Sequence, residues 1–222
     1  MSSRVSRRVR TWMVGVAVVL AAVACTREGY DTGDGSYSSL RADFVEAHTV
    51  AAQTIDRAVT DEGALLQLSP YATATWATKA DTLYRALLYY QQRPAQQPEP
   101  VALQPVAVLR PKSAAELGTD LPTDPVLLES AWLGSDGRYL NLGLFLKTGK
   151  ADDEEAAHRL ALLWEGETRT LRLLHDQGGV PEYYSTRLWV SIPLTDELRS
   201  SAFQLVANTY QGEVLRSFEV NN

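Results

Sequence analysis

Cys25 is the only cysteine of this 222-residue chain, and its position gives it a defined chemistry. It directly follows the apolar run Trp12–Ala24, which four arginines within residues 4–10 precede. A basic segment, a short apolar segment and a small residue before the cleavage point are typical of a secretion signal. The run is shorter than the roughly 20 residues that cross a bilayer. We therefore expect residues 1–24 to be a signal peptide.

Two cleavage products are compatible with this signal. In the first, Leu20–Cys25 is a lipobox, and the thiol of Cys25 accepts a diacylglyceryl group with acyl chains such as palmitate. In the second, Ala22-Val23-Ala24 is an A-x-A site that releases a soluble periplasmic protein. A secreted chain with one unpaired thiol is unusual unless that thiol is consumed. We therefore favour lipidation at Cys25 and read residues 25–36 as a polar tether. We expect a lipid-anchored location in the cell envelope, at the outer membrane of a Gram-negative bacterium.

The other chemically capable residues form no recognisable catalytic or metal-binding pattern. His48, His158 and His175 are the only histidines, and their spacing is not that of metal ligands. Residues 152–155 are four consecutive acids, but acid–base catalysis needs two carboxylates held in different environments. We predict a solvated loop there, and we expect no catalytic residues, no metal and no cofactor.

Aromatic side chains are the remaining candidate binding groups, because their faces stack on the apolar faces of sugars. Most of them should be core residues, since large aromatics contribute the greatest burial energy in small β domains. The candidates for an exposed platform are Trp76, Trp132, Trp164, Trp189, Tyr89, Tyr90, Tyr183 and Tyr184.

The charge of the chain limits its partners. It has 21 basic and 27 acidic residues, a formal charge of −6. Four of the basic residues and none of the acidic ones lie in residues 1–24, so removing that segment leaves 17 basic and 27 acidic residues, formally −10. Affinity for nucleic acid comes mainly from basic residues, so we expect no nucleic-acid partner. We expect attachment to the membrane only through the lipid, and an envelope protein or a glycan as partner.

The elements that must position these side chains are mainly strands. Leu40, Ala42 and Phe44 alternate with Arg41, Asp43 and Val45, and β-like runs follow at 53–59, 64–68, 82–91 and 101–109. The run at 82–91 also has helical spacing, but its β-rich surroundings favour a strand. Residues 60–63 read as a hairpin turn and residues 92–100 as a loop. Five strands within residues 37–112 predict a small OB-like barrel.

A second β-series follows a proline-containing linker at about 110–125. The seven strand candidates lie at about 126–133, 138–147, 158–165, 169–175, 186–193, 202–209 and 213–220. They predict an immunoglobulin-like sandwich over residues 113–222. Leu140, Leu142, Leu144 and Leu146 should face its core, whereas Tyr139, Asn141 and Lys147 should face solvent.

Several segments of the mature chain resemble the NigD-like lipoproteins of Gram-negative bacteria. These are Gly29–Gly35, Asp124–Val126, Ala131–Gly134, Tyr139–Leu142 and Asn208–Glu213. The resemblance implies an N-terminal OB-like domain followed by a β-sandwich. The activity of the family is not established, and its association with bacteriocin gene clusters implies an immunity or accessory role.

These observations favour a noncatalytic, lipid-anchored envelope protein that binds another envelope component or acts as an immunity-type accessory. The first alternative is a surface lipoprotein that binds carbohydrate or peptide. The second is a hydrolase whose site the sequence does not reveal.

Overall fold

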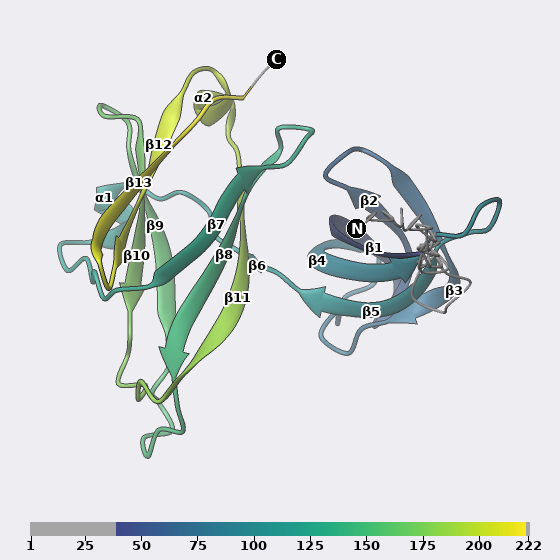
Figure 1. Ribbon diagram of the computed structural model, residues 1–222, viewed down its shortest axis with the longest axis horizontal. Coiled ribbons are helices and arrows are strands. Elements are labelled where there is room, and N and C mark those ends of the chain that lie inside the picture. Colours follow the sequence, from purple (N-terminus) through teal and green to yellow (C-terminus); the bar gives the residue numbers. More distant parts are fainter. Residues whose placement is uncertain (1–38, 221–222) are drawn as a thin grey trace, which may run out of the picture. The chain divides into compact units, whose positions relative to one another are not determined.

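The computed structural model describes residues 39–220, and the predicted signal peptide, Cys25 and the tether lie outside them. The chain begins with five strands joined in one antiparallel sheet of order β3-β2-β1-β4-β5. The strands are β1 (Leu40–Ala51), β2 (Thr54–Thr60), β3 (Leu65–Thr73), β4 (Thr82–Gln91) and β5 (Glu99–Pro105). The sheet curls, and the Ser69 N–H donates a hydrogen bond to the carbonyl of Pro98, 3.0 Å away, which draws β3 toward β5. The predicted OB-like barrel is confirmed (Figure 1).

The interior of the barrel follows from the alternation of its strands. Val45 and Ala47 of β1, Ile55 of β2 and Leu88 of β4 are fully or almost fully buried in one cluster. Residues 82–91 form a strand and not a helix, because β1 and β5 pair with β4 along its two edges. Pairing on both sides satisfies the backbone of this run, so its helical spacing does not decide its conformation.

The second β-series forms two four-stranded sheets (Figure 1). One has the order β6-β11-β8-β7, with β6 (Ala107–Val108), β7 (Leu127–Leu133), β8 (Tyr139–Thr148) and β11 (Tyr184–Pro193). The other has the order β13-β12-β10-β9, with β9 (Arg159–Glu165), β10 (Thr170–Asp176), β12 (Phe203–Thr209) and β13 (Gly212–Phe218). The short helices α1 (Ala114–Leu117) and α2 (Asp196–Arg199) complete it. The predicted sandwich is confirmed.

The sandwich core contains the leucine row of β8. Leu140, Leu142 and Leu144 have no exposed surface and Leu146 is 6% exposed. They pack with residues of the other sheet such as Leu171. Period-two spacing places all four on one face of the strand, which confirms their predicted orientation.

The chain changes sheet earlier than the expected linker. The strand predicted over 101–109 is divided at Val106, because β5 ends at Pro105 and β6 pairs in parallel with β11. The Val106 N–H donates to the carbonyl of Arg85 (3.1 Å), and the Leu109 N–H donates to the carbonyl of Ser191 (3.1 Å). Both sheets therefore hold this crossing by backbone hydrogen bonds.

Residues 110–125 run along the sandwich. Lys112 bridges to Leu163 and Thr123 bridges to His175. Whether the two parts can be separated by cleavage near residues 110–125 stays a prediction. Within residues 39–220, no helix has both the length and the apolar character that a membrane span requires.

Candidate functional site

A cleft of about 380 Å³ lies where the outer face of the barrel meets the outer face of the sandwich. The barrel contributes residues of β1, β4 and the turn after β2, and the sandwich contributes residues of β7, the turn after it and β11. The lining residues are Ala42, Asp43, Phe44, Thr60, Asp61, Glu62, Leu87, Tyr89, Trp132, Leu133, Gly134, Ser135 and Trp189.

Three aromatic rings form the apolar centre of this cleft. Phe44 of β1 packs edge-to-face against Trp132 (centroids 5.4 Å apart) and against Trp189 (5.6 Å). Trp132 and Trp189 are 6.0 Å apart and nearly perpendicular. Edge-to-face packing directs the positive edge of one ring to the negative face of the next, which fixes their orientations. All three are half-buried, so part of each ring remains accessible.

Gly143 of β8 makes room for this aromatic group. It pairs with Trp189 across β11 and with Ser130 across β7. A Cβ atom at Gly143 would lie 2.7 Å from Cζ3 of Trp189 and 2.6 Å from Oγ of Ser130. Real Cβ atoms do not approach neighbours so closely, so a side chain here would displace the indole.

A buried ion pair of the barrel lies at the junction with the sandwich. Arg85 of β4 donates from Nη1 and Nη2 to the two carboxylate oxygens of Asp61, each 2.6 Å away. The Arg85 side chain is 2% exposed and that of Asp61 is 13% exposed. The Arg85 guanidinium also lies 4.0 Å from the ring centroid of Tyr139, in cation–π geometry.

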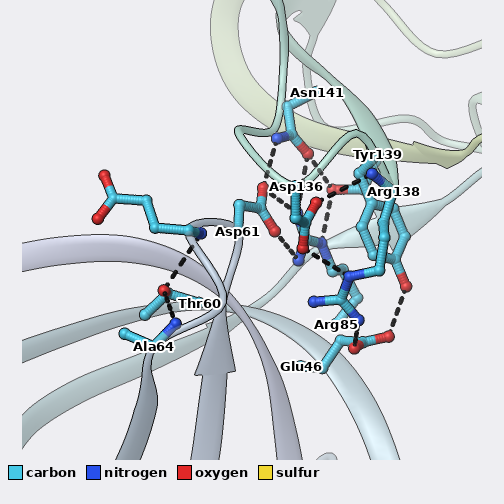
Figure 2. A network of polar contacts seen from close by, with 11 residues as sticks. Glu46, Thr60, Asp61, Ala64, Arg85, Asp136, Arg138, Tyr139 and Asn141 are labelled. Carbon is cyan, nitrogen blue, oxygen red and sulfur yellow. Dashed lines mark hydrogen bonds and ion pairs between the residues drawn. The ribbon is translucent and has the colours of Figure 1, made fainter. Parts of the chain in front are cut away.

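Two polar side chains of the sandwich, Ser191 and Asn141, complete the hydrogen bonding of this pair, and Figure 2 shows Asn141 beside Asp61. Arg85 Nε donates to Oγ of Ser191 (2.9 Å), and Asn141 donates from Nδ2 to Asp61 (2.8 Å). The Oδ1 atom of Asn141 accepts from Arg85 Nη2 (3.0 Å) and from the Ser191 hydroxyl (2.6 Å). A buried charge is tolerated when it is paired and its remaining polar groups are satisfied.

Asn141 corrects the expectation from the sequence. We predicted that it faces solvent, but it is fully buried. Its side chain does leave the sandwich on the face opposite Leu140 and Leu142, and the barrel then covers that face. The strand register is therefore right and the assignment of this face to solvent is wrong.

A second polar group extends the junction. Tyr139 donates from its hydroxyl to Glu46 of β1 (2.8 Å), and Arg138 pairs with the same Glu46 and with Asp136. The backbone N–H of Asp136 donates to the carbonyl of Asp61 (2.8 Å). Partial burial is the main cause that raises the pKa of Tyr139 to about 12, and the hydrogen bond to Glu46 contributes to the same shift. The phenol is therefore a neutral donor at physiological pH.

The arrangement suits binding. The centre of the cleft is apolar and aromatic, and Asp43, Asp61 and Glu62 supply acidic groups around it. Arg85 and Asn141 donate hydrogen bonds to the carboxylate of Asp61, so this acid has a structural role at the junction. Glu62 is exposed, and its carboxylate faces solvent in the turn between β2 and β3.

The structure brings together only some of the aromatic residues considered from the sequence. Trp132, Trp189 and Tyr89 share the cleft. Trp76 packs on Tyr84 in the barrel (5.7 Å), and Trp164 donates a hydrogen bond to Glu197 on the sandwich. Tyr90 is buried. Tyr183 and Tyr184 are exposed on the sandwich.

The histidines also differ in their surroundings. His48 lies between Asp56 (2.7 Å) and Asp81 (3.0 Å). His158 and His175 stack, with Nδ1 of His158 3.0 Å from Nε2 of His175. Within residues 39–220, no three His, Cys, Asp or Glu side chains are grouped so that they could hold a metal ion. Asp152, Asp153, Glu154 and Glu155 are all exposed, as expected of a solvated loop.

Sequence reasoning missed several residues of the site, among them Arg85 and Phe44. The signal for Arg85 was its place inside the apolar run at 82–91, where a charge needs a buried partner. Phe44 was assigned to a half-buried strand, but its face was not linked to Trp132 or Trp189, which lie about 90 and 145 residues later.

The histidine pair predicts a pH dependence of stability. Nδ1 of His175 lies 3.3 Å from the carbonyl of Asp124, so we assign it the proton. Nε2 of His175 then accepts from His158, and Nε2 of His158 is buried without a partner among the described residues. Burial, with a smaller effect of His175, lowers the pKa of His158 below its ordinary 6.5. The unfolded chain therefore binds this proton more readily, and His158 makes the folded state lose stability as the pH falls through about 6.5.

The expected result is a wild-type free energy of unfolding that falls, relative to His158→Gln, between about pH 7.5 and about pH 5.5. Denaturant melts measure both proteins. His48→Asn is the matched control, because His48 should change the free energy of unfolding with pH in the opposite direction. Hydrogen bonds to Asp56 and Asp81 raise the pKa of His48, so its contribution is present below about 6.5 and is lost as the pH rises through the folded-state value. A difference between wild type and His158→Gln that does not change with pH would contradict the assignment.

The ion pair predicts a strong and non-additive effect of substitution. Arg85→Met leaves Asp61 buried without its partner and should cost about 3–5 kcal/mol of stability. Arg85→Met combined with Asp61→Leu removes both charges and should cost less than Arg85→Met alone. Arg57→Met, whose side chain is 40% exposed in its pair with Asp56, should cost at most about 1 kcal/mol. Urea melts measure these three variants and Asp61→Leu alone, and a cost of the double variant equal to the sum of its two single costs would show that the pair is not coupled.

Solved structures of other proteins share this architecture. No family model matches the sequence, and no curated protein matches it. Among solved structures, a NigD-like immunity protein from Bacteroides caccae is 22% identical, with 81% of this chain and 92% of that chain covered and a TM-score of 0.59. A protein of unknown function from Bacteroides vulgatus is 16% identical, with 82% and 92% covered and a TM-score of 0.61. This chain therefore has the fold of the NigD-like proteins, which confirms the resemblance at the level of the fold.

Proposed function

We propose that this chain is a noncatalytic, lipid-anchored protein of the cell envelope that binds another envelope component at the aromatic cleft. The observation that carries the proposal is the group of three half-buried rings, Phe44, Trp132 and Trp189, gathered from both parts of the chain. Binding sites are commonly concave and apolar with a few placed polar groups, and they often lie between domains.

The rigidity of the cleft supports this role. The bonds of Arg85, Asp61 and Asn141 connect β4 and the turn after β2 to β8. β4 is the neighbour of β1, and β8 is the neighbour of β7 and β11, which carry the rings. A preformed site loses less conformational entropy when it binds a ligand than a mobile one does. The buried network therefore favours recognition of a defined shape.

The location rests on Cys25 and the apolar run before it. A lipid-anchored chain holds its folded part at the membrane surface, where envelope proteins and glycans are concentrated. The likeness to a solved NigD-like immunity protein supports an immunity or accessory role as the finer description. Protection from a bacteriocin would require binding to it or to its target, which the cleft could provide.

Two alternative functions would use the cleft differently. A carbohydrate-binding lipoprotein would use the indoles of Trp132 and Trp189 as stacking surfaces. A hydrolase would need convergent acids, but Asp61 is occupied by Arg85 and Asn141, and Tyr90 donates a hydrogen bond to Asp43 (2.6 Å). These bonds favour binding over hydrolysis.

The anchor is tested by replacing its acceptor. Cys25→Ser should move the protein from the membrane fraction to the soluble fraction, because the hydroxyl does not accept the lipid in place of the thiol. Ser36→Ala in the expected tether is the matched control and should leave the protein in the membrane fraction. Fractionation followed by mass spectrometry of the mature N-terminus measures both. A wild-type protein that is soluble and starts with an unmodified Cys25 would favour the A-x-A cleavage.

The cleft is tested by photocrosslinking in bacteria that express the full chain. A benzophenone amino acid at Glu62 or at Ser135, both exposed residues of the cleft, should give a discrete crosslinked species after irradiation. The same group at Val101, which is exposed on β5, is the control and should give none. Because benzophenone inserts into C–H bonds, it captures proteins and glycans alike. Equal crosslinking at all three positions would show that the cleft is not the binding site.

A further inference from the structure

Strand β7 is an open edge that connects the aromatic cleft to a second groove. β7 ends the order β6-β11-β8-β7, and within the described chain it forms a ladder only with β8. Val126, just before β7, bridges to Thr209 of the other sheet, so the edge is open from Leu127 onward. Trp132 and Leu133, at its C-terminal end, line the aromatic cleft. Leu127 and Leu128, at its N-terminal end, line a groove of about 230 Å³.

This second groove lies between the edges of the two sandwich sheets. Val126, Leu127 and Leu128 come from the sheet that contains β7, and Tyr210, Val214 and Arg216 come from the β12–β13 hairpin. Leu127 is 50% exposed and Tyr210 is 41% exposed. The groove is therefore lined mainly by apolar side chains that remain accessible.

The geometry points to an extended peptide as the ligand. An edge strand presents unpaired backbone N–H and C=O groups, which an added strand can satisfy. A seven-residue partner segment spans about 20 Å at about 3.3 Å per residue, the length of β7 itself. Its side chains would alternate between the cleft on the barrel side and the groove between the sheets.

The chemistry of the two pockets indicates which side chains an added peptide would carry at its two ends. Of the acids that line the aromatic cleft, Asp61 is held by Arg85 and Asn141, and Asp43 accepts a hydrogen bond from Tyr90. Glu62 is exposed, and no described side chain pairs with its carboxylate.

Arg85 and Arg187 already lie over the rings of Phe44 (5.5 Å) and Trp189 (5.2 Å). Trp132 and Glu62 are therefore the groups that favour a lysine or arginine of a ligand, through cation–π and ionic attraction. The groove at Leu127 favours an aliphatic side chain.

A bulge in β7 makes this edge selective. The register with β8 shifts between Leu128 and Ser130, so Glu129 is the extra residue. Bulges interrupt indiscriminate strand pairing at sheet edges. The two pockets must therefore supply part of the affinity.

We propose that β7 binds an extended segment of a partner protein by strand addition, with a cationic side chain in the aromatic cleft and an aliphatic one in the groove at Leu127. This rests on the proposed function, because it assigns the component that the cleft binds. Binding of a glycan or of a second copy of this chain at β7 would be a different outcome of the test.

The test selects random nine-residue linear peptides, displayed on phage, for binding to the full mature chain carrying Cys25→Ser. Peptides with a lysine or arginine near one end and an aliphatic residue near the other should be enriched. One such synthetic peptide is then the probe. Leu127→Glu should weaken its binding about tenfold and Glu62→Gln about threefold. Val101→Glu, an equally exposed apolar position on β5, is the matched control and should leave the affinity unchanged.

Hydrogen exchange identifies the binding mode. The probe peptide should slow amide exchange in residues 127–133 and leave β5 of the barrel unchanged. Failure to enrich peptides, or binding that Leu127→Glu does not weaken, would overturn the inference. So would protection of β7 by dimerisation of the free protein. Crosslinking at Glu62 in cells, without a peptide ligand, would leave the proposed function standing and refute strand addition.

Discussion

The ion pair between Arg85 and Asp61 is the interaction on which the junction depends. Arg85 belongs to β4 and Asp61 to the turn after β2, so the pair begins inside the barrel. Its remaining donors and acceptors are satisfied by Asn141 and Ser191 of the sandwich. If the sandwich were displaced, a buried charge would lose these partners. Desolvation makes such a loss costly, and this restricts how the two parts can meet.

A buried ion pair contributes more to specificity of arrangement than to net stability, because removing two charges from water offsets much of their attraction. Here the arrangement it specifies is that of the aromatic cleft. Phe44 lies two residues from Glu46 on the same face of β1, and Trp189 lies two residues from Ser191 on the same face of β11. The strands that carry Phe44 and Trp189 therefore also carry, on the same face, a residue of the polar junction.

The junction also relates the cleft to the open edge of the sandwich. Trp132 belongs at once to the aromatic group and to β7, the last strand of its sheet. A ligand held at the rings thus lies next to unpaired backbone groups. This proximity, rather than the aromatic residues alone, distinguishes a peptide site from a sugar platform, because sugars need ring faces whereas an extended peptide uses a strand edge as well.

The sequence by itself determined the local structure. Alternating apolar residues predicted the strands, and the row Leu140 to Leu146 revealed which face of β8 enters the core. The sequence predicted the two β folds because turn chemistry and period-two spacing act within short segments. Only the tertiary structure decided that the opposite face, with Asn141, is covered by the barrel, that the chain changes sheet at Val106, and that Phe44 meets Trp132 and Trp189. The physical reason is that periodicity distinguishes the two faces of a strand, but what covers a polar face depends on groups distant in the chain, such as Arg85 and Asp61, whose pairing leaves no periodic signal.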